Sequence, residues 1–346
     1  MAAGLRHALI ATGDRSGQET QLLGFGLNRC GQLGTRSTNP SQQLVHSTIP
    51  GRVKRMACGR EHSALITHIL GDSPAVLTCG SNAHGQLGRP ASDTSLGWQE
   101  IKGLRSLLEA DEVPVDVKCG LDHTLVLTSR GQVLSVGWGA DGQLGAGAPP
   151  PLRAYEPQIV RDLPSQGIAS ITTSTDFCLA LARDGSLFCW GNAEHGQNMA
   201  GRPVAQIPLP VRIPQLPGNP PIAQVAAAGT LALVLTADHG HVYACGYGAL
   251  GLGPDTLEAL DPVHIPNLTG VRRLWASTDR CMALDFHGRL LSWGLSNSEG
   301  RLGFGASANV FEPQALSIDP ASIDPDLVAL GNDIVVIAMQ EDEGSG

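Results

Sequence analysis

The sequence lacks several features that would assign the protein to a common functional class. No run of eighteen apolar residues occurs in its 346 residues, so no membrane span is expected. Lys and Arg number 23 against 32 Asp and Glu, and the formal net charge of −9 argues against a general surface for DNA or RNA. No nucleophile–base pair, carboxylate dyad or metal-ligand spacing stands out, so we expect no catalytic, cofactor-binding or metal-binding residues and no enzyme activity.

Glycine is abundant instead, with 43 residues, and much of it recurs in one motif. The stretch VGWGADGQLGAG (136–147) could be taken for a phosphate-binding loop, but no lysine of the P-loop type follows it. Related stretches recur every 52 to 57 residues, which marks a repeat protein. The aligned turn glycines are Gly31, Gly85, Gly142, Gly196, Gly248 and Gly300.

A second motif, G-x-x-H, has the same period. His7, His62 and His123 occupy its histidine position, and degenerate copies bring the total to seven against six glycine turns. Phe177 and Arg280 stand at the equivalent position elsewhere, which argues against a shared metal site. We interpret the histidines as structural residues, buried and hydrogen-bonded to local backbone.

Short apolar strands follow each G-x-x-H motif. Residues 123–128 (HTLVLT) and 132–137 (QVLSVG) are separated by a short turn and predict a β-hairpin. A repeating unit of about 50 residues built from such hairpins is typical of a β-propeller blade. We therefore predict an all-β, seven-bladed propeller over residues 1–340, followed by an acidic tail at 341–346.

The unequal motif counts predict an incomplete first blade. With seven G-x-x-H strands and six turns, residues 1–25 should supply only half a blade, leaving an exposed edge. The strand near residues 334–338 should close the ring beside it.

A position shortly before the turn glycine holds asparagine in some repeats and glycine in another. Asn28, Asn82 and Asn192 share a position with Gly139. Asparagine and glycine both tolerate positive φ, so we expect left-handed backbone at this position, in a turn that packs one blade on the next.

The eight cysteines fall largely at equivalent repeat positions, as do Cys58 and Cys119. Residues equivalent in this way lie on different blades, too far apart for a disulfide, and the sequence has no CxxC pair. Small buried thiols in a reducing compartment are the expected state.

G-x-x-H-S/T, then an aromatic residue or cysteine before glycine, then GQLG, resembles the repeat of the regulator-of-chromosome-condensation family over essentially the whole chain. GWGADGQ, GNAEHGQ and GYGALGLGP look like a mitochondrial subgroup, the member encoded in the Williams–Beuren region. The resemblance implies a seven-bladed propeller and a mitochondrial location, although no transit peptide is visible and a cytoplasmic location is the alternative. It also implies protein partners: ribosome-assembly factors, with pseudouridine synthases and ribosomal RNA nearby, or a GTPase.

Three functions stay open on these grounds. A non-catalytic scaffold in assembly of the mitochondrial large ribosomal subunit is favoured, because no repeat-breaking acidic loop is marked out for displacing a phosphate. The alternatives are a guanine-nucleotide exchange factor, acting on a small GTPase or the dynamin-like GTPase of inner-membrane fusion, and a cytosolic propeller that aids tRNA or translation-factor modification. The longest segment between repeats supplies the candidate partner-binding residues, which are Trp98, Glu109, Asp111 and Glu112.

Overall fold

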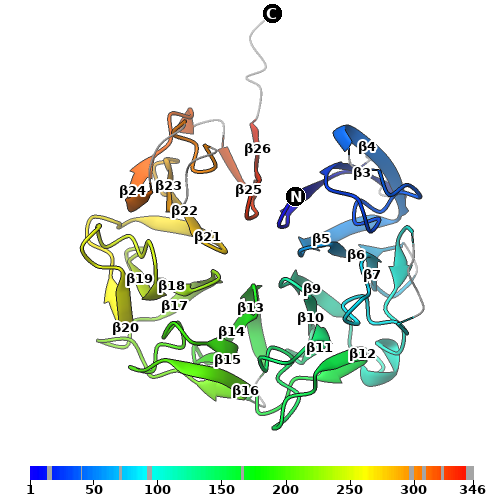
Figure 1. Ribbon diagram of the computed structural model, residues 1–346, viewed down its shortest axis with the longest axis horizontal. Coiled ribbons are helices and arrows are strands. Elements are labelled where there is room, and N and C mark those ends of the chain that lie inside the picture. The colour runs from blue at the N-terminus through cyan, green and yellow to red at the C-terminus, as the bar shows by residue number, and fades with distance from the viewer. Residues whose placement is uncertain are drawn as a thin grey trace, which may run out of the picture.

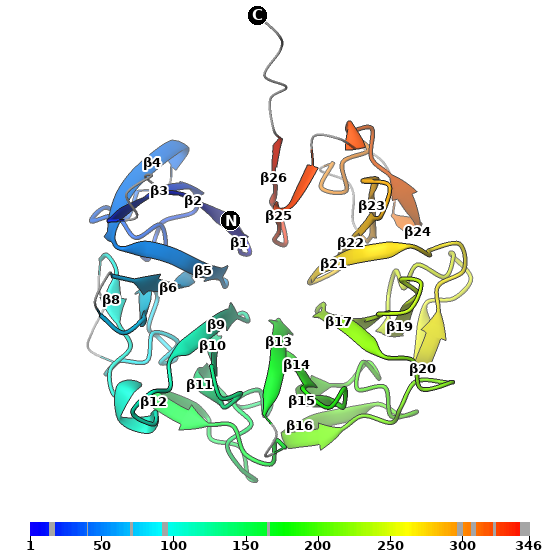
Figure 2. The same cartoon turned by 180° about the vertical axis from the view of Figure 1, so that it is seen from behind.

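The computed structural model describes residues 1–13, 18–39, 41–69, 72–91, 96–164, 167–295, 300–305, 309–320 and 323–339. Antiparallel sheets stand radially around a central axis, and each sheet runs from its innermost strand at the hub to its last strand at the rim (Figures 1 and 2). The described part of the chain holds six four-stranded sheets and one two-stranded sheet, in agreement with the predicted all-β propeller. No helix among the described residues is long and apolar enough to cross a membrane.

The first three sheets take up the N-terminal part of the chain. The first contains β1 (Ala2–Ala3), β2 (His7–Gly13), β3 (Glu19–Gly26) and β4 (Ser41–Pro50). The second contains β5 (Arg52–Cys58), β6 (His62–His68), β7 (Ala75–Gly80) and β8 (Gln99–Glu100), followed by the 3₁₀ turn η1 (Arg105–Leu107). The third contains β9 (Pro114–Cys119), β10 (His123–Thr128), β11 (Val133–Trp138) and β12 (Arg153–Ile159).

The remaining sheets continue the ring in sequence order. The fourth contains β13 (Ile168–Ser174), β14 (Phe177–Ala182), β15 (Leu187–Ala193) and β16 (Val204–Arg212). The fifth contains β17 (Ile222–Ala227), β18 (Leu231–Thr236), β19 (Val242–Tyr247) and β20 (Glu258–His264). The sixth contains β21 (Val271–Ser277), β22 (Arg280–Asp285), β23 (Leu290–Gly294) and β24 (Val310–Ala315), and the seventh pairs β25 (Ile323–Leu330) with β26 (Val335–Met339).

The second strand of a sheet is buried and mostly apolar because neighbouring sheets pack against both of its faces. In β10, as in β14 and β18, every residue is buried. The largest buried side chains include Trp190, Trp293 and Phe177, which fill the space between sheets. The predicted hairpin at 123–128 and 132–137 is confirmed as β10 and β11.

The sheet with fewer strands is the seventh and not the first, so the predicted position of the incomplete blade was wrong. Residues 1–25 form three strands of a four-stranded first sheet, although β1 is only two residues long. The two-stranded sheet is β25 and β26, near the predicted closing strand. Backbone hydrogen bonds close the ring between the first and last sheets, from Asn332 N to Gly4 O (3.1 Å) and from Asp333 N to Leu5 O (3.1 Å).

The repeated turn glycines have the backbone that the sequence predicted. Gly31, Gly85 and Gly142 have φ of 81°, 88° and 88°, a region that L side chains rarely adopt. A Cβ on Gly85 would lie 2.4 Å from the carbonyl oxygen of Ala154 in the next sheet. This turn therefore packs sheet against sheet, as expected.

The left-handed backbone expected at the preceding asparagine position was wrong. Asn28, Asn82 and Asn192 are not among the residues with positive φ. The asparagine side chain organises the turn instead, since Asn82 Oδ1 accepts the Leu87 amide at 3.1 Å and its Nδ2 donates to the Arg89 carbonyl at 3.0 Å. Asn28 does the same with the Leu33 amide. Asn192 stands four residues before its turn glycine instead of three, and its Oδ1 accepts the Glu194 amide at 3.2 Å.

Candidate functional site

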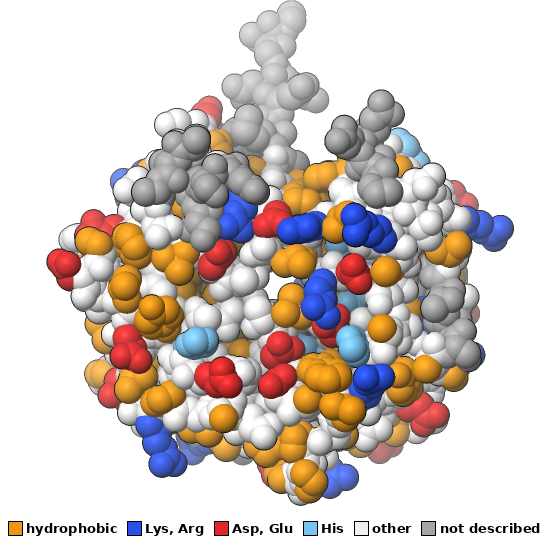
Figure 3. Space-filling model, in the orientation of Figure 1, with side chains coloured by type: hydrophobic (Ala, Val, Ile, Leu, Met, Phe, Trp, Pro, Cys, Tyr) orange, Lys and Arg blue, Asp and Glu red, His pale blue; other side chains and the backbone are white. Residues whose placement is uncertain are grey.

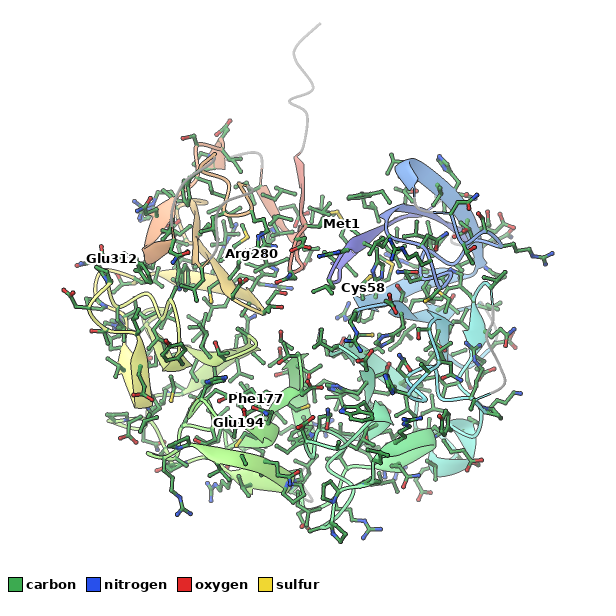
Figure 4. All side chains as sticks on the ribbon, viewed as in Figure 1. Met1, Cys58, Phe177, Glu194, Arg280 and Glu312 are labelled. Atoms are coloured by element: carbon green, nitrogen blue, oxygen red, sulfur yellow. The ribbon has the colours of Figure 1, made fainter. Side chains whose placement is uncertain are left out.

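Alternating strand direction puts the G-x-x-H turns and the GQLG turns at the same end of every sheet. The first strand ends at the G-x-x-H turn and the third strand ends just before the GQLG turn, so both kinds of turn form one face of the propeller, called here the turn face. Figure 3 looks onto this face and shows acidic, basic and histidine side chains around its centre. Glu194, which is labelled in Figure 4, follows β15 in the turn between the third and fourth strands and therefore belongs to this face.

The repeat histidines join neighbouring sheets. His7 Nε2 lies 2.8 Å from Ser63 Oγ and His62 Nε2 lies 3.0 Å from Thr124 Oγ1, a hydroxyl in the next sheet in both cases. His123 Nε2 contacts Thr173 Oγ1 at 2.9 Å in the same way. The predicted burial is confirmed, but the predicted backbone partner was wrong because a hydroxyl is interposed.

The hydroxyl passes the connection on to backbone. Thr124 Oγ1 donates to the carbonyl of Gln86 at 2.8 Å, and Ser63 Oγ donates to the carbonyl of Gln32 at 2.8 Å. Since the hydroxyl proton is used in this way, the histidine must donate from Nε2. Burial lowers the pKa of His62 to about 3, the pKa of His123 to about 3 and the pKa of His7 to about 4, so all three rings are neutral at physiological pH.

The glutamine of the GQLG turn makes a second connection between sheets. Gln143 Nε2 donates to Asp176 Oδ1 at 2.7 Å, and Gln86 Nε2 donates to Asp122 Oδ1 at 3.5 Å. In both cases the acceptor is the residue just before the histidine position of the next repeat. That position is acidic in five repeats, at Glu61, Asp122, Asp176, Asp279 and Asp333.

These carboxylates differ in how they are neutralised. Asp122 pairs with the Arg60 guanidinium, and Asp333 pairs with Arg6 Nε at 3.1 Å. Asp176 instead receives its hydrogen bond from an amide. Burial raises the pKa of Asp176 to about 6, and the nearby Asp141 and Asp122 add to this rise.

Asp122, Asp141 and Asp176 together form what we call the acidic patch, on the turn face over the third and fourth sheets. A half-buried tryptophan adjoins it, since Trp138 Nε1 donates to Asp141 Oδ2 at 3.3 Å. The Arg153 guanidinium lies 5.7 Å from the Trp138 ring centroid, and the His84 ring packs edge-on at 5.0 Å. A positioned aromatic residue beside desolvated charges is the composition of a protein-binding hot spot.

The hub offers little room for a small molecule. The cavity there has a volume of about 90 Å³ and is lined by inner turns such as Gly4, Gly59, Gly120 and Thr175. Typical ligand pockets hold roughly 300–1,000 Å³. Among the described residues no group of three or more His, Cys, Asp or Glu side chains could hold a metal ion.

The structure does not bring the predicted partner-binding residues together. Trp98 is half-buried rather than exposed, because its indole packs against Gly34 at the edge of the first sheet. Glu109 and Asp111 lie at the opposite face, where Asp111 Oδ1 pairs with Arg130 Nη2 at 2.5 Å in the turn after β10. Their role in binding a partner stays a prediction.

Glu112 is unsuited to the predicted role. It is only 3% exposed, and its carboxylate accepts hydrogen bonds from the Thr128 hydroxyl and from Glu109 N (3.2 Å). Glu112 therefore stabilises the loop through buried hydrogen bonds and does not present its carboxylate to a partner. The tail at 341–346 lies outside the described residues.

The sequence analysis did not predict the acidic patch, although the sequence carries a signal for it. An acid directly before the histidine position recurs in GREH, GLDH and TSTDF, at the same register as the histidines themselves. Asp141 is also the single charge in the stretch 136–147, which holds Trp138 as well. An acidic residue that recurs at one position of the repeat is a candidate functional residue, as the repeat histidine is.

Comparison with known proteins agrees with the repeat and with the propeller fold. The regulator of chromosome condensation (RCC1) repeat matches residues 20–66, 75–127, 130–181 and 184–235. A mouse RCC1-like G exchanging factor-like protein is 34% identical over 92% of this chain and 71% of its own length. Among solved structures, human WBSCR16 is 30% identical with a TM-score of 0.83, covering 98% of this chain and 86% of that one.

Yeast Prp20p, whose structure was described with its binding to Gsp1p and histones, superimposes with a TM-score of 0.78 over 99% of this chain and 82% of its own. At 20% identity that likeness concerns the fold alone. The repeat matches and the relatives at 30% identity or more extend over most of the propeller. The chain belongs to the RCC1 repeat family.

Proposed function

We propose that this protein is a guanine-nucleotide exchange factor that engages a GTP-binding protein through the acidic patch and Trp138. The carrying observation is Asp176, a half-buried carboxylate whose hydrogen bond comes from an amide and whose pKa is raised to about 6. Such a group gains most from the approach of a lysine or arginine. The names of the similar proteins, which include a G exchanging factor-like protein, favour exchange over the scaffold that the sequence alone favoured.

The chemistry of exchange suits this site. A GTP-binding protein holds its nucleotide phosphates with a P-loop lysine and Mg²⁺. An acidic side chain presented on a rigid propeller competes with the phosphates for that lysine, and no covalent bond is made or broken. The half-buried Trp138 would supply the apolar anchor beside it.

Linkage dictates the first test. If the protein weakens GDP binding by some factor, GDP must weaken binding of the protein by the same factor. Binding should therefore be measured to nucleotide-free and GDP-loaded forms of two candidates, Gsp1p and the dynamin-like GTPase of inner-membrane fusion. We expect one of them to bind tighter when nucleotide-free.

Two matched variants locate the site. Asp176→Asn keeps the oxygen that accepts the Gln143 hydrogen bond but removes the charge, and it should weaken binding by about tenfold or more, the size of a hot-spot loss. Glu109→Gln, on the opposite face, should leave binding unchanged. Equal affinity for the nucleotide-free and GDP-loaded forms of both GTPases would contradict exchange, and full binding by Asp176→Asn would contradict the site.

The finer predictions from the sequence are retained as proposals. A role in assembly of the mitochondrial large ribosomal subunit predicts co-sedimentation with large-subunit precursors, and a mitochondrial location predicts co-purification with mitochondria. A cytosolic role in tRNA or translation-factor modification predicts recovery with cytosolic complexes instead.

A further inference from the structure

The fourth sheet differs from its neighbours in how its hairpin turn meets the segment that leads to the next sheet. In the third sheet the carbonyl of the turn glycine Gly131 accepts the Ile168 amide at 2.9 Å. In the fifth sheet the carbonyl of Gly240 accepts the Val271 amide at 3.1 Å. A Cβ on either glycine would lie 2.5 Å from the nitrogen of that amide, so turn and segment close tightly on each other.

The corresponding contact is missing in the fourth sheet. The structure describes both Gly185 and Ile222, but no hydrogen bond joins them, and a Cβ on Gly185 would have no atom within 4 Å. The connecting segment 213–221 has nine residues, against eight at 160–167 and six at 265–270, and four of the nine are proline. Since proline fixes φ and has no amide proton to donate, this segment is poorly suited to closing on the turn.

Both ends of the segment are nevertheless held in place. At its start, Ile213 N donates to the Leu187 carbonyl at 2.8 Å. At its end, Ala237 N in the next sheet donates to the Pro221 carbonyl at 2.7 Å. The segment therefore stands away from the hairpin turn between two fixed points.

A cavity of about 460 Å³ occupies this gap, on the face of the propeller opposite the turn face. We call it the linker pocket, and its volume lies in the range of roughly 300–1,000 Å³ that ligand pockets have. Its apolar lining comes from the buried residues Leu187, Ile213 and Leu216 and from the half-buried Ile222.

The polar edge of the linker pocket favours an acidic ligand. Arg183 and Arg212 are exposed there, and Asp184 is the only acid among the described lining residues. The Asp184 carboxylate already accepts the Ser186 amide at 2.9 Å. The Arg183 guanidinium uses one donor on the Ser129 carbonyl, at 2.8 Å, and keeps the others for a ligand.

We propose that the linker pocket binds a short extended segment of a partner protein, in which an apolar side chain stands next to an aspartate or glutamate. The apolar side chain lies on the apolar lining, and the carboxylate pairs with Arg183 and Arg212. The backbone of the bound segment supplies what closure supplies in the third and fifth sheets. A carbonyl accepts the Ile222 amide, and an amide donates to the Gly185 carbonyl.

The missing hydrogen bond favours a peptide over a small apolar acid. It joins two peptide groups in the neighbouring sheets, so its replacement needs a donor and an acceptor, which a peptide backbone carries and a fatty acid does not. Charge complementarity with the two arginines selects an acidic segment. The site lies on the opposite face from the acidic patch and does not rest on the proposed exchange activity.

The test selects peptides without assuming their sequence. A phage-displayed library of random nonapeptides is selected on the full chain and counter-selected on the double variant Arg183→Gln with Arg212→Gln. We expect enriched sequences in which an apolar residue adjoins Asp or Glu. The strongest of them, made as a synthetic peptide, should raise the melting temperature and slow hydrogen exchange of the Ile222 amide.

Matched variants assign the contacts. The double variant should bind the synthetic peptide about tenfold more weakly or less, and so should a peptide with Asn or Gln in place of its acid on the unaltered protein. Arg161→Gln, which changes an exposed arginine in the connecting segment after β12, should leave binding unchanged. Decanoate, an apolar carboxylate without a peptide group, should bind at least about tenfold more weakly than the peptide.

Three results would overturn the proposal. They are a selection that enriches no sequence, a peptide that binds equally well without its acid, and binding that leaves exchange of the Ile222 amide unchanged. Decanoate that binds as tightly as the peptide would assign the linker pocket to a small apolar acid and contradict the peptide. If the double variant fails to fold, the comparison of the two peptides on the unaltered protein still decides.

Discussion

The three buried histidines should make the propeller acid-sensitive. In the unfolded chain each histidine takes up a proton near pH 6.5, whereas in the fold His7 does so only near pH 4 and His62 and His123 near pH 3. Because the pKa of each is lowered by folding, their contribution to stability is complete above pH 6.5 and is lost as the pH falls below it.

The size of the effect follows from those pKa values. Each histidine removes about 1.4 kcal/mol from the free energy of unfolding per pH unit, or about 2 kcal/mol between pH 6.5 and 5. Three of them remove about 6 kcal/mol. Asp176 works in the opposite direction, since its raised pKa lets the folded state take up a proton near pH 6, but its partial exposure limits this gain to about 1 kcal/mol.

Urea unfolding at pH 7.5 and pH 5 measures the loss, which should amount to several kcal/mol. His123→Phe should reduce it by about a third, because Phe177 shows that the equivalent position accepts a buried phenyl ring. The exposed His287 provides a control, and His287→Gln should leave the pH dependence unchanged. An unchanged pH dependence in His123→Phe would refute the reasoning.

Three further substitutions test the packing and the patch. Gly85→Ala should cost several kcal/mol of stability, because both the positive φ and the Ala154 carbonyl oppose a Cβ. Gly185→Ala has φ 85° but open space around the Cβ, so it should cost only about 1 kcal/mol. Thermal unfolding of the two variants separates the cost of backbone strain from the cost of the steric clash. Glu112→Gln should destabilise the chain by about 1–3 kcal/mol through its buried hydrogen bonds, and a urea titration showing no change would contradict that role. Asp176→Asn should raise the stability of the fold at pH 7.5 by about 1 kcal/mol, because an ionised carboxylate whose pKa is raised by folding destabilises the folded state. A lower melting temperature would contradict the burial of this carboxylate.

The repeat made most of the fold predictable. A period of 52 to 57 residues indicates the number and order of blades. The turn glycines at 31, 85 and 142 could be predicted because their positive φ favours glycine over other residue types. The asparagine position was misjudged because Asn28 and Asn82 act through their side chains, and a propensity for left-handed backbone does not distinguish the two causes.

The site was less predictable because it depends on contacts between repeats. Nothing local shows that His62 reaches a hydroxyl in the next sheet, or that Glu112 turns inward while Asp111 points out. The place of the two-stranded sheet was also misassigned. Counting motifs shows that one sheet differs, but only the strand pairing shows that it is the sheet formed by β25 and β26.

Release of fluorescent GDP tests the central claim most directly. The GTPase that binds tighter when nucleotide-free should lose GDP faster in the presence of the protein. Asp176→Asn should remove most of that acceleration, while the double variant Glu109→Gln with Asp111→Asn, which alters the opposite face, should keep it. No acceleration with either GTPase, or acceleration that survives Asp176→Asn and is lost in the double variant, would contradict the account.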